Sequence, residues 1–495
     1  MSNKKQNNQP PIIRSPALDS LGHVATPPER KGRVATAVVE EHPRAKGRNS
    51  GPLVKGRASG PLGKVREETE ENEEAQEAVR IEPLPPPTGR GDYQLFVAVA
   101  ALLCFGLVMV YSASATANYN DPSYWFRREL LWVGLGIVAM FITTRIAYEN
   151  WRRISVPALL GALLLLILVL VVGRKLNGGQ RWLPIGPFTF QPSELAKLAF
   201  TLYIADWLSR KGSKQVSSFT YGTVPFAILT GVVIALVILQ NDLGTAIIIA
   251  FFAVAMFAAA GANLLHLVPM GVSGIAAGAY IAFSTPFRAA RLEAFLHPLD
   301  CASNASYQVC QGLIALGSGG LTGLGLGASR QKAGFLPNPW TDSIFAVIGE
   351  ELGFIGCVAV LLLIGFVAYR AFRAGRGAPD TYGTLLAIGF TCWIAVQSFL
   401  NIGSVVALIP FTGVPLPFVS FGGSSLVTTM AAVGILLNIS RYHQRSSSRH
   451  KSSSGRQHDA GIDIRRGDRG THLPGAGRRQ SAPERLQRRD SVSGR

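Results

Sequence analysis

Ten long apolar stretches between residues 93 and 440 restrict what this chain can fold into. A helix needs about 20 mostly apolar residues to cross the hydrocarbon core of a bilayer. A water-soluble domain has no comparable use for so many segments of this kind. We therefore expect an all-α integral membrane protein with about ten transmembrane helices. The expected spans are 93–113, 130–147, 155–173, 192–208, 222–239, 244–261, 264–284, 343–369, 382–409 and 421–440.

The two ends of the chain differ in composition from this central region. Residues 1–91 contain few aromatic side chains and many Pro, Glu, Lys and Arg residues, so they cannot bury enough apolar surface to fold. The sequence predicts three parts: a disordered N-terminal tail at 1–91, a membrane domain at 92–441 and a disordered basic C-terminal tail at 442–495.

The net charge of +18 raises the question of nucleic-acid binding. Residues 441–495 hold 14 Arg and Lys residues against five acidic ones, without regularly spaced aromatic residues or a folded module. A polybasic segment next to a final membrane helix is attracted to anionic lipid headgroups. Membrane lipids, and no nucleic acid, are therefore the expected partners of this tail.

The distribution of Lys and Arg between the loops predicts the orientation of the chain. With both termini inside, the inner and outer loops each carry nine such residues, and the basic C-terminal tail decides in favour of this arrangement. The sequence thus predicts a multi-pass protein of the cell membrane with both termini in the cytoplasm. The long loop between helices seven and eight, 285–342, is then extracellular. So many outer cations run against the usual bias and predict a negatively charged ligand outside.

The five cysteines show no spacing typical of a metal site, and no metal-ligating residues are predicted. Cys301 and Cys310 lie close together in the long outer loop, where oxidation is permitted. A disulfide and two free thiols both remain open for this pair.

The first of three polar outer segments is GGQRWLPIGPFTFQPSELAKLAF at 178–200. Pro192 falls where a helix accepts proline, in its first turn, and predicts the start of helix four. Glu194 and Lys197 lie three apart on one face of this helix. Ionisable groups inside a span are costly, which favours a functional role. A mutually neutralising structural pair is the alternative.

The second segment is YQVCQGLIALGSGGLTGLGLGASRQKAGFLPNPWTDS at 307–343. It opens with an apolar run too short to span, and irregular Gly-rich backbone with Arg330 and Lys332 follows. Irregular backbone survives at membrane depth where it lines a water-filled cavity, so we expect a short helix dipping into one. The backbone N–H groups and the two cations would form a phosphate cradle. Packing of glycines against neighbouring helices is the alternative.

Asp342 comes directly before helix eight. At a membrane–water boundary, partial desolvation raises the pKa of a carboxylate towards that of a working general base. An aspartate in this place would also serve as a helix N-cap. Glu350, about two turns into the same helix, borders the face of Asp342 and sits deeper. Both acids are candidate site residues.

The third segment is NIGSVVALIPFTGVPLPFVSFGGSS at 401–425. Its prolines break the helix at the outer boundary. The hydroxyls of Ser424 and Ser425 at the start of helix ten favour an anion, and ordinary capping explains them equally well.

Three further charged residues lie on the outer side. Arg288 and Arg291, three apart after span seven, would reach a pyrophosphate or act as snorkelling anchors. Asp242, in the turn QNDLGT at 240–245, most simply caps helix six.

Several blocks follow one another in a fixed order: GLVMVYSASA, GGQRWLPIG with QPSELAKL, QNDLGTA, YQVCQGLIALGSGG, GLGLGASRQKAGFLPNPWTDSIFAVIGEELGFIG and NIGSVVALIPFTGVPLPFVSFGGSS. Together they resemble the SEDS family, the polytopic glycosyltransferases that polymerise peptidoglycan from lipid II. The resemblance covers about 93–441 and leaves out both tails. GLVMVYSAS and IGEELG look closer to the division members of the family, the FtsW proteins, than to the elongation members, the RodA proteins.

The resemblance implies an inverting peptidoglycan glycosyltransferase that faces the outside and serves septal synthesis in cell division. Asp342 takes the place of the family's proposed catalytic acid. It would deprotonate the GlcNAc 4-hydroxyl of one lipid II, and this oxygen would attack C1 of the MurNAc on the growing chain and release undecaprenyl pyrophosphate. Cations expected to neutralise the pyrophosphates are Arg181, Lys197, Arg288, Arg291, Arg330 and Lys332; Glu194, Glu350, Ser424 and Ser425 complete the expected substrate-binding set.

The resemblance also implies partners and a cofactor. The family works with a class B penicillin-binding protein, here an FtsI-like transpeptidase, and with other divisome proteins. A divalent cation, Mg²⁺ or Mn²⁺, would assist the leaving group. The chain departs from the common pattern at Asn241, where the family usually has proline, and at 338–340, where an acid and a His often precede the aspartate.

Two other functions remain open, a lipid II flippase and a non-catalytic division scaffold. Lys197 inside a span and the broken outer segments would suit transport. A transporter should carry charged groups on both sides of the midplane, however. Because the polar chemistry gathers on the outer side, the sequence favours the polymerase.

Overall fold

The computed structural model describes residues 87, 89, 91–117, 121–176, 179–186, 188–283, 286–302 and 306–442. The disordered tails predicted at 1–91 and 442–495 lie almost entirely outside these residues. Their disorder and the predicted domain boundaries therefore stay predictions.

Helices dominate the described residues, and each predicted span contains one. Five of them are long and apolar enough to cross a membrane by length and composition, which confirms a helical membrane protein. The count of ten spans stays a prediction. The helices in the predicted spans are α2 (Tyr93–Ser114), α3 (Tyr124–Arg145), α4 (Trp151–Val172), α5 (Pro192–Ser209), α7 (Val224–Leu239), α8 (Leu243–Ala259), α9 (Leu264–Phe283), α12 (Ile344–Arg376), α13 (Thr381–Val405) and α14 (Ser424–Ile439).

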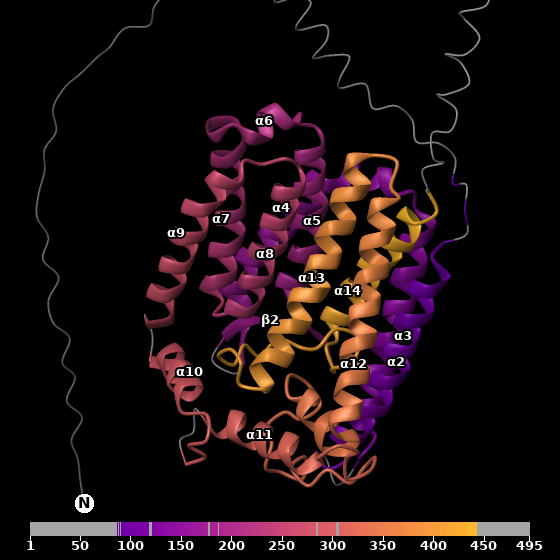
Figure 1. Cartoon of the computed structure of the whole chain (residues 1–495), viewed down its shortest axis with the longest axis vertical. Helices are drawn as coiled ribbons and strands as arrows, with labels where there is room; N and C mark the ends of the chain where they lie inside the picture. Colours follow the sequence, from indigo (N-terminus) through magenta and orange to yellow (C-terminus); the bar gives the residue numbers. More distant parts are fainter. Residues whose placement is uncertain are drawn as a thin grey trace, which may run out of the picture. The chain divides into compact units, whose positions relative to one another are not determined.

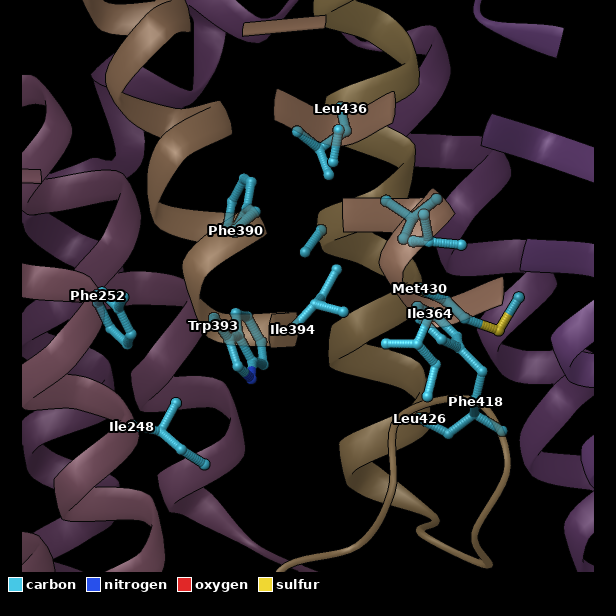
Figure 2. Packing of buried hydrophobic residues seen from close by; sticks show 14 of the residues in the cluster. Ile248, Phe252, Ile364, Phe390, Trp393, Ile394, Phe418, Leu426, Met430 and Leu436 are labelled. Carbon is cyan, nitrogen blue, oxygen red and sulfur yellow. The ribbon is translucent and has the colours of Figure 1, made fainter. Parts of the chain in front are cut away.

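Close helix pairs form the core. The most extensive packing joins α3 to α14, α12 to α13, α4 to α5 and α8 to α13. Gly434 permits the first of these pairs, because a side chain there would collide with Met140 and Thr143 of α3. Buried apolar side chains, among them Phe252 and Trp393, fill the space between α8, α13 and α14 (Figure 2).

A small antiparallel sheet lies between α4 and α5, which the sequence analysis did not predict. Its strands are β1 (Arg174–Leu176), β2 (Gly179–Ile185) and β3 (Phe188–Phe190), in the order β1-β2-β3. Leu183 of β2 pairs with Phe190 of β3. Each strand is short, so local sequence alternation is weak. The sheet gives Arg181 a fixed place near the start of α5.

Helix α12 is kinked at Gly353, which has φ 67°. The kink frees backbone N–H and C=O groups of α12, and these form hydrogen bonds with the backbone of the preceding Gly-rich loop. Leu324 N–H donates to Glu350 O at 2.9 Å, and Phe354 N–H donates to Gly320 O at 2.9 Å. The kink thus docks the loop onto the N-terminal part of α12.

Short helices complete the fold: η1 (Tyr148–Asn150), α6 (Ser213–Ser217), η2 (Phe219–Thr223), α10 (Pro286–Leu296) and α11 (Tyr307–Gly319). The apolar run at the start of the second polar segment therefore forms a short helix, α11, as predicted. Figure 1 shows α6 at one end of the helices and β2, α10 and α11 towards the other.

Candidate active site

Asp342 lies in the turn before α12 and is partly buried. Its Oδ1 accepts a hydrogen bond from Thr341 Oγ1 at 3.0 Å, and its backbone oxygen accepts one from Asn401 Nδ2 at 2.8 Å. Gly413 lies against the carboxylate, since a Cβ there would be 3.6 Å from Asp342 Oδ2. The N-cap of α12 is Ser343, which rules against simple capping by Asp342.

The surroundings of Asp342 act on its proton affinity in opposite directions. Burial raises the pKa of the carboxyl above its ordinary value, and this is the largest effect. The Thr341 hydroxyl and the guanidinium groups of Arg291 and Arg181 work in the opposite direction and lower that pKa. A raised pKa makes a carboxylate a stronger base, which suits it to accept a proton.

Two arginines from separate elements act electrostatically on Asp342. Arg291 of α10 donates from Nη1 to Phe411 O at 3.3 Å, and Arg181 of β2 pairs with Asp242 at 3.4 Å. Burial and the like charge of Arg181 lower the pKa of Arg291, while Asp342 and Asp242 oppose this. Arg288, which was predicted to reach a pyrophosphate together with Arg291, also lies in α10, and the structure describes only its backbone.

Asp242 anchors Arg181. Its carboxylate caps α8 by accepting from Thr245 N at 3.2 Å, which confirms the capping prediction. It also accepts from Gln191 Nε2 at 2.8 Å. The preceding Asn241 has φ 61°, a conformation closed to proline, so this turn differs from the proline-containing turn common in the family.

Glu194 and Lys197 lie on one helix face, as their spacing predicted, and form a buried ion pair of 2.9 Å. Lys197 also donates to Gln397 Oε1 at 2.8 Å and lies 4.6 Å from the ring centre of Trp393. Both side chains are fully buried. The contacts fit the structural alternative, and a direct role in substrate binding stays a prediction.

Ser424 and Ser425 begin α14, as predicted, and both are buried. Ser424 Oγ accepts from Gln191 N at 3.3 Å, and Ser425 Oγ accepts from Gln397 Nε2 at 3.4 Å. The two hydroxyls therefore join the Lys197 network to the Asp242 network. Their predicted contact with substrate remains untested.

Glu350 binds the Gly-rich loop that precedes α12. Its carboxylate accepts from Ser329 Oγ, from Arg330 N at 2.9 Å and from Gln331 N at 3.3 Å. The loop was predicted to cradle a phosphate, and an internal carboxylate takes these donors instead. The Arg330 side chain is exposed.

Lys332 is buried and pairs with Glu351 at 2.6 Å. Ser112 Oγ of α2 donates to the same carboxylate at 2.7 Å. Glu351 was not singled out in the sequence, where its place beside Glu350 gave no sign of a separate partner. Lys332 therefore anchors the loop on two helices, because it pairs with Glu351 of α12 and donates to Ser112 of α2.

Sequence reasoning also missed Asn401 and Glu129. Asn401 is fully buried and holds both Asp342 O and Val414 O, each at 2.8 Å. Glu129 of α3 is buried, and its Oε2 has no hydrogen-bond partner within the described part of the chain. For Glu129, the signal available in the sequence was an acidic residue directly before a predicted span. For Asn401, the sequence offered no signal beyond a polar residue type.

The residues around Asp342 do not by themselves fit a divalent cation. In the described ranges, no three His, Cys, Asp or Glu side chains lie close enough together to hold a metal ion. The charged groups acting on Asp342 are guanidinium groups, which repel a cation. The predicted Mg²⁺ or Mn²⁺ stays a prediction, and no step below depends on it.

These features define a polytopic membrane protein with a carboxylate and two cations gathered at one end of its helices. Comparison with known families specifies the class further. The chain belongs to the FtsW/RodA/SpoVE family, whose model, described as "Cell cycle protein", matches residues 93–445. The predicted membership of the SEDS family is confirmed.

Curated relatives match over the same region. Stage V sporulation protein E of Bacillus subtilis is 43% identical over 356 residues, which cover 71% of this chain and 97% of the relative. A probable peptidoglycan glycosyltransferase FtsW of Geobacter metallireducens is 40% identical over 356 residues, with 71% and 95% coverage.

Solved structures show the same fold. A chain from a peptidoglycan synthase complex that coordinates polymerization and crosslinking is 28% identical, with a TM-score of 0.59, and the match covers 72% of this chain and 99% of that one. The rod shape determining protein RodA of Thermus thermophilus is 31% identical, with a TM-score of 0.54 and 72% and 98% coverage.

Proposed function

We propose that this protein is a peptidoglycan glycosyltransferase that polymerises lipid II into glycan strands on the outer face of the cytoplasmic membrane, for septal synthesis in cell division. The observation that carries the proposal is Asp342, a carboxylate whose pKa burial raises, near Arg291 and Arg181. Relatives named as probable peptidoglycan glycosyltransferases FtsW support the activity.

In this mechanism Asp342 is the general base. Its carboxylate removes the proton from the GlcNAc 4-hydroxyl of the acceptor lipid II. The oxygen attacks C1 of the donor MurNAc from the face opposite the leaving group, so the new glycosidic bond forms with inversion. Undecaprenyl pyrophosphate leaves, and positive charge stabilises the developing negative charge on its oxygens.

Arg291 and Arg181 are the cations best placed for the pyrophosphate. Each already interacts electrostatically with Asp342, so a substrate that reaches the base also reaches them. Lys332 and Lys197 are engaged in buried ion pairs and would act by fixing the surrounding backbone. Arg330, with its exposed side chain, would meet the ligand at the edge of the site.

We also propose that both termini are cytoplasmic. Gly89 N–H bonds to Arg441 O at 3.1 Å, and Asp92 N–H bonds to Ser440 Oγ at 2.8 Å. The two ends of the membrane region thus leave at the same place. Asp342 lies at the other end of α12 from Arg370, which pairs with Asp92 at 2.6 Å.

A class B penicillin-binding transpeptidase is the proposed partner, with other divisome proteins. A glycan polymerase supplies the strands that a transpeptidase crosslinks. The similarity to a chain from a complex that coordinates polymerization and crosslinking supports this pairing.

The test is polymerisation of labelled lipid II by the purified protein with its transpeptidase in detergent, where there is no membrane to cross. Asp342→Asn should lower the rate about a hundredfold or more, because general-base catalysis contributes that much. Asp300→Asn, an exposed aspartate of the same outer loop, is the matched control and should stay within about twofold. Normal polymerisation by Asp342→Asn would remove the assigned base. A protein that moves lipid II across vesicles but makes no polymer would instead be a flippase.

A further inference from the structure

A disulfide joins Cys301 to Cys310, with the two Cα atoms 5.4 Å apart. Cys301 follows the end of α10, the helix that carries Arg291. Cys310 lies in the first turns of α11 and is buried. The bond therefore links two helices of the long loop covalently.

α11 is held firmly beside Asp342. Gln308 Nε2 donates to Ser343 Oγ at 3.0 Å, one residue from the proposed base. Along its length α11 packs against α12, and a side chain at Gly319 would collide with the backbone of Gly349. Whatever is bonded to Cys310 is thereby fixed relative to Asp342.

Among the described residues, α10 packs less extensively than α11, although its Ala294 is buried. Within the described residues it packs chiefly against α9, and α9 exposes much of its own surface, with Leu265 at 76% and Ile275 at 75% exposure. The contact from Arg291 Nη1 to Phe411 O, at 3.3 Å, brings α10 to the site. A hydrogen bond of this kind contributes little net free energy, so this contact adds little to the docking of α10.

We propose that the Cys301–Cys310 disulfide is a positioning element that keeps α10 docked so that Arg291 stays beside Asp342, and that polymerisation depends on oxidation of this pair. The inference rests on the proposed function. On oxidation, two thiols lose two protons and two electrons to a thiol–disulfide oxidoreductase outside the membrane, and one S–S bond forms. With the bond closed, α10 is tethered over a few residues, which raises the effective concentration of Arg291 at the site.

Reduction of the disulfide should release α10 without unfolding the membrane helices. Dithiothreitol converts the disulfide to two thiols and is itself oxidised to a cyclic disulfide. The rate of polymerisation of lipid II in detergent should fall about tenfold, as expected when a charged group is displaced from its position. The double variant Cys301→Ser with Cys310→Ser should show the same loss without reductant, and reoxidation of the wild type should restore its rate.

Two further measurements identify the route of the effect. In Arg291→Gln, reduction should cause no additional loss, because the group being positioned is already absent. Amide hydrogen exchange at 286–296 should become faster on reduction, independently of any activity. The variant Cys104→Ser with Cys392→Ser, which removes two free cysteines, should respond to dithiothreitol like the wild type.

The possible results separate this inference from the proposed function. Oxidised protein that polymerises at the same rate after complete reduction overturns the inference and leaves the proposed function standing. An equal loss on reduction in Arg291→Gln also overturns it. If the oxidised protein makes no polymer at all, the proposed function is overturned. In that case, amide hydrogen exchange at 286–296 that does not change on reduction would by itself refute the tethering of α10.

Discussion

Each end of the helices carries a cluster of two arginines and two aspartates, and the two clusters are built differently. The Arg152 cluster consists of Arg152, Asp206, Arg210 and Asp380. The Asp342 cluster consists of Arg181, Asp242, Arg291 and Asp342. In the first, Asp206 accepts from Arg210 Nε at 2.8 Å and from Ser155 Oγ at 3.1 Å, and Asp380 accepts from Tyr148 Oη at 2.6 Å and from Gly383 N at 3.1 Å.

In the Asp342 cluster, the Asp242 carboxylate also accepts several hydrogen bonds, whereas the Asp342 carboxylate accepts fewer. Among the described residues, the side-chain donor to the Asp342 carboxylate is the Thr341 hydroxyl, and the arginines act on it from a distance. A fully bonded buried acid rigidifies the fold. An acid that keeps acceptor capacity can receive a proton from substrate. The comparison separates a cluster that holds helices together from one that can do chemistry.

The largest expected difference comes from Asp206→Asn, set against Asp342→Asn. Loss of the charge on the buried Asp206 removes one of the two carboxylates that pair with the partly buried Arg152, so the free energy of unfolding in detergent should drop by about 3 kcal/mol. Polymerisation per folded molecule should change little. Asp342→Asn should leave the unfolding free energy unchanged or raise it. Equal destabilisation by both variants would abolish the distinction between the clusters.

Asn401→Ala tests the contact that positions Asp342. The variant removes the donors to Asp342 O and Val414 O, and we expect about 2 kcal/mol of lost transition-state stabilisation, or roughly a thirtyfold lower rate. Ser398→Ala, one turn earlier on α13, removes only a bond to Ile394 O and serves as the control. A rate for Asn401→Ala equal to that of the control would show that this contact does not matter for catalysis.

Arg291→Gln should change the pH dependence of polymerisation. Arg291 lowers the pKa of Asp342, so its removal lets that pKa rise further. Because the base acts when deprotonated, the acidic fall in rate should move to higher pH. On the acidic side the rate should drop about tenfold for every pH unit by which the profile moves. Arg291→Lys keeps the charge and should move the profile less. An acidic limb that stays in place, or moves to lower pH, contradicts the proposed coupling.

Gly413→Ala should have the smallest effect. Gly413 has φ 68°, where a Cβ costs about 1 kcal/mol. The new methyl would meet Asp342 Oδ2 at an ordinary contact distance of 3.6 Å. Thermal unfolding should therefore show a modest loss of stability with a nearly normal rate. Gly403→Ala, within α13, is the control; a larger rate loss for Gly413→Ala than for Asn401→Ala would show that the loop itself limits catalysis.

Much of the fold and part of the site follow from local features of the sequence. The lengths of the apolar stretches located the helices, because a bilayer requires that length. The spacing of Glu194 and Lys197 predicted their shared helix face, because residues three apart lie on the same side of a helix. The place of Asp342 before a span predicted its partial burial. Each of these inferences depends on neighbours along the chain.

The helical membrane architecture, the family and the acid that stands before α12 therefore follow from the amino-acid sequence alone. The tertiary structure decided which charges meet: that Glu350 binds the loop ahead of it, that Asp242 holds Arg181, that Asn401 holds Asp342, and that Cys301 reaches Cys310. The physical reason is that periodicity and spacing act within one element. Pairing between distant segments depends on how the helices pack, and the type of a residue does not specify which distant residue it will contact.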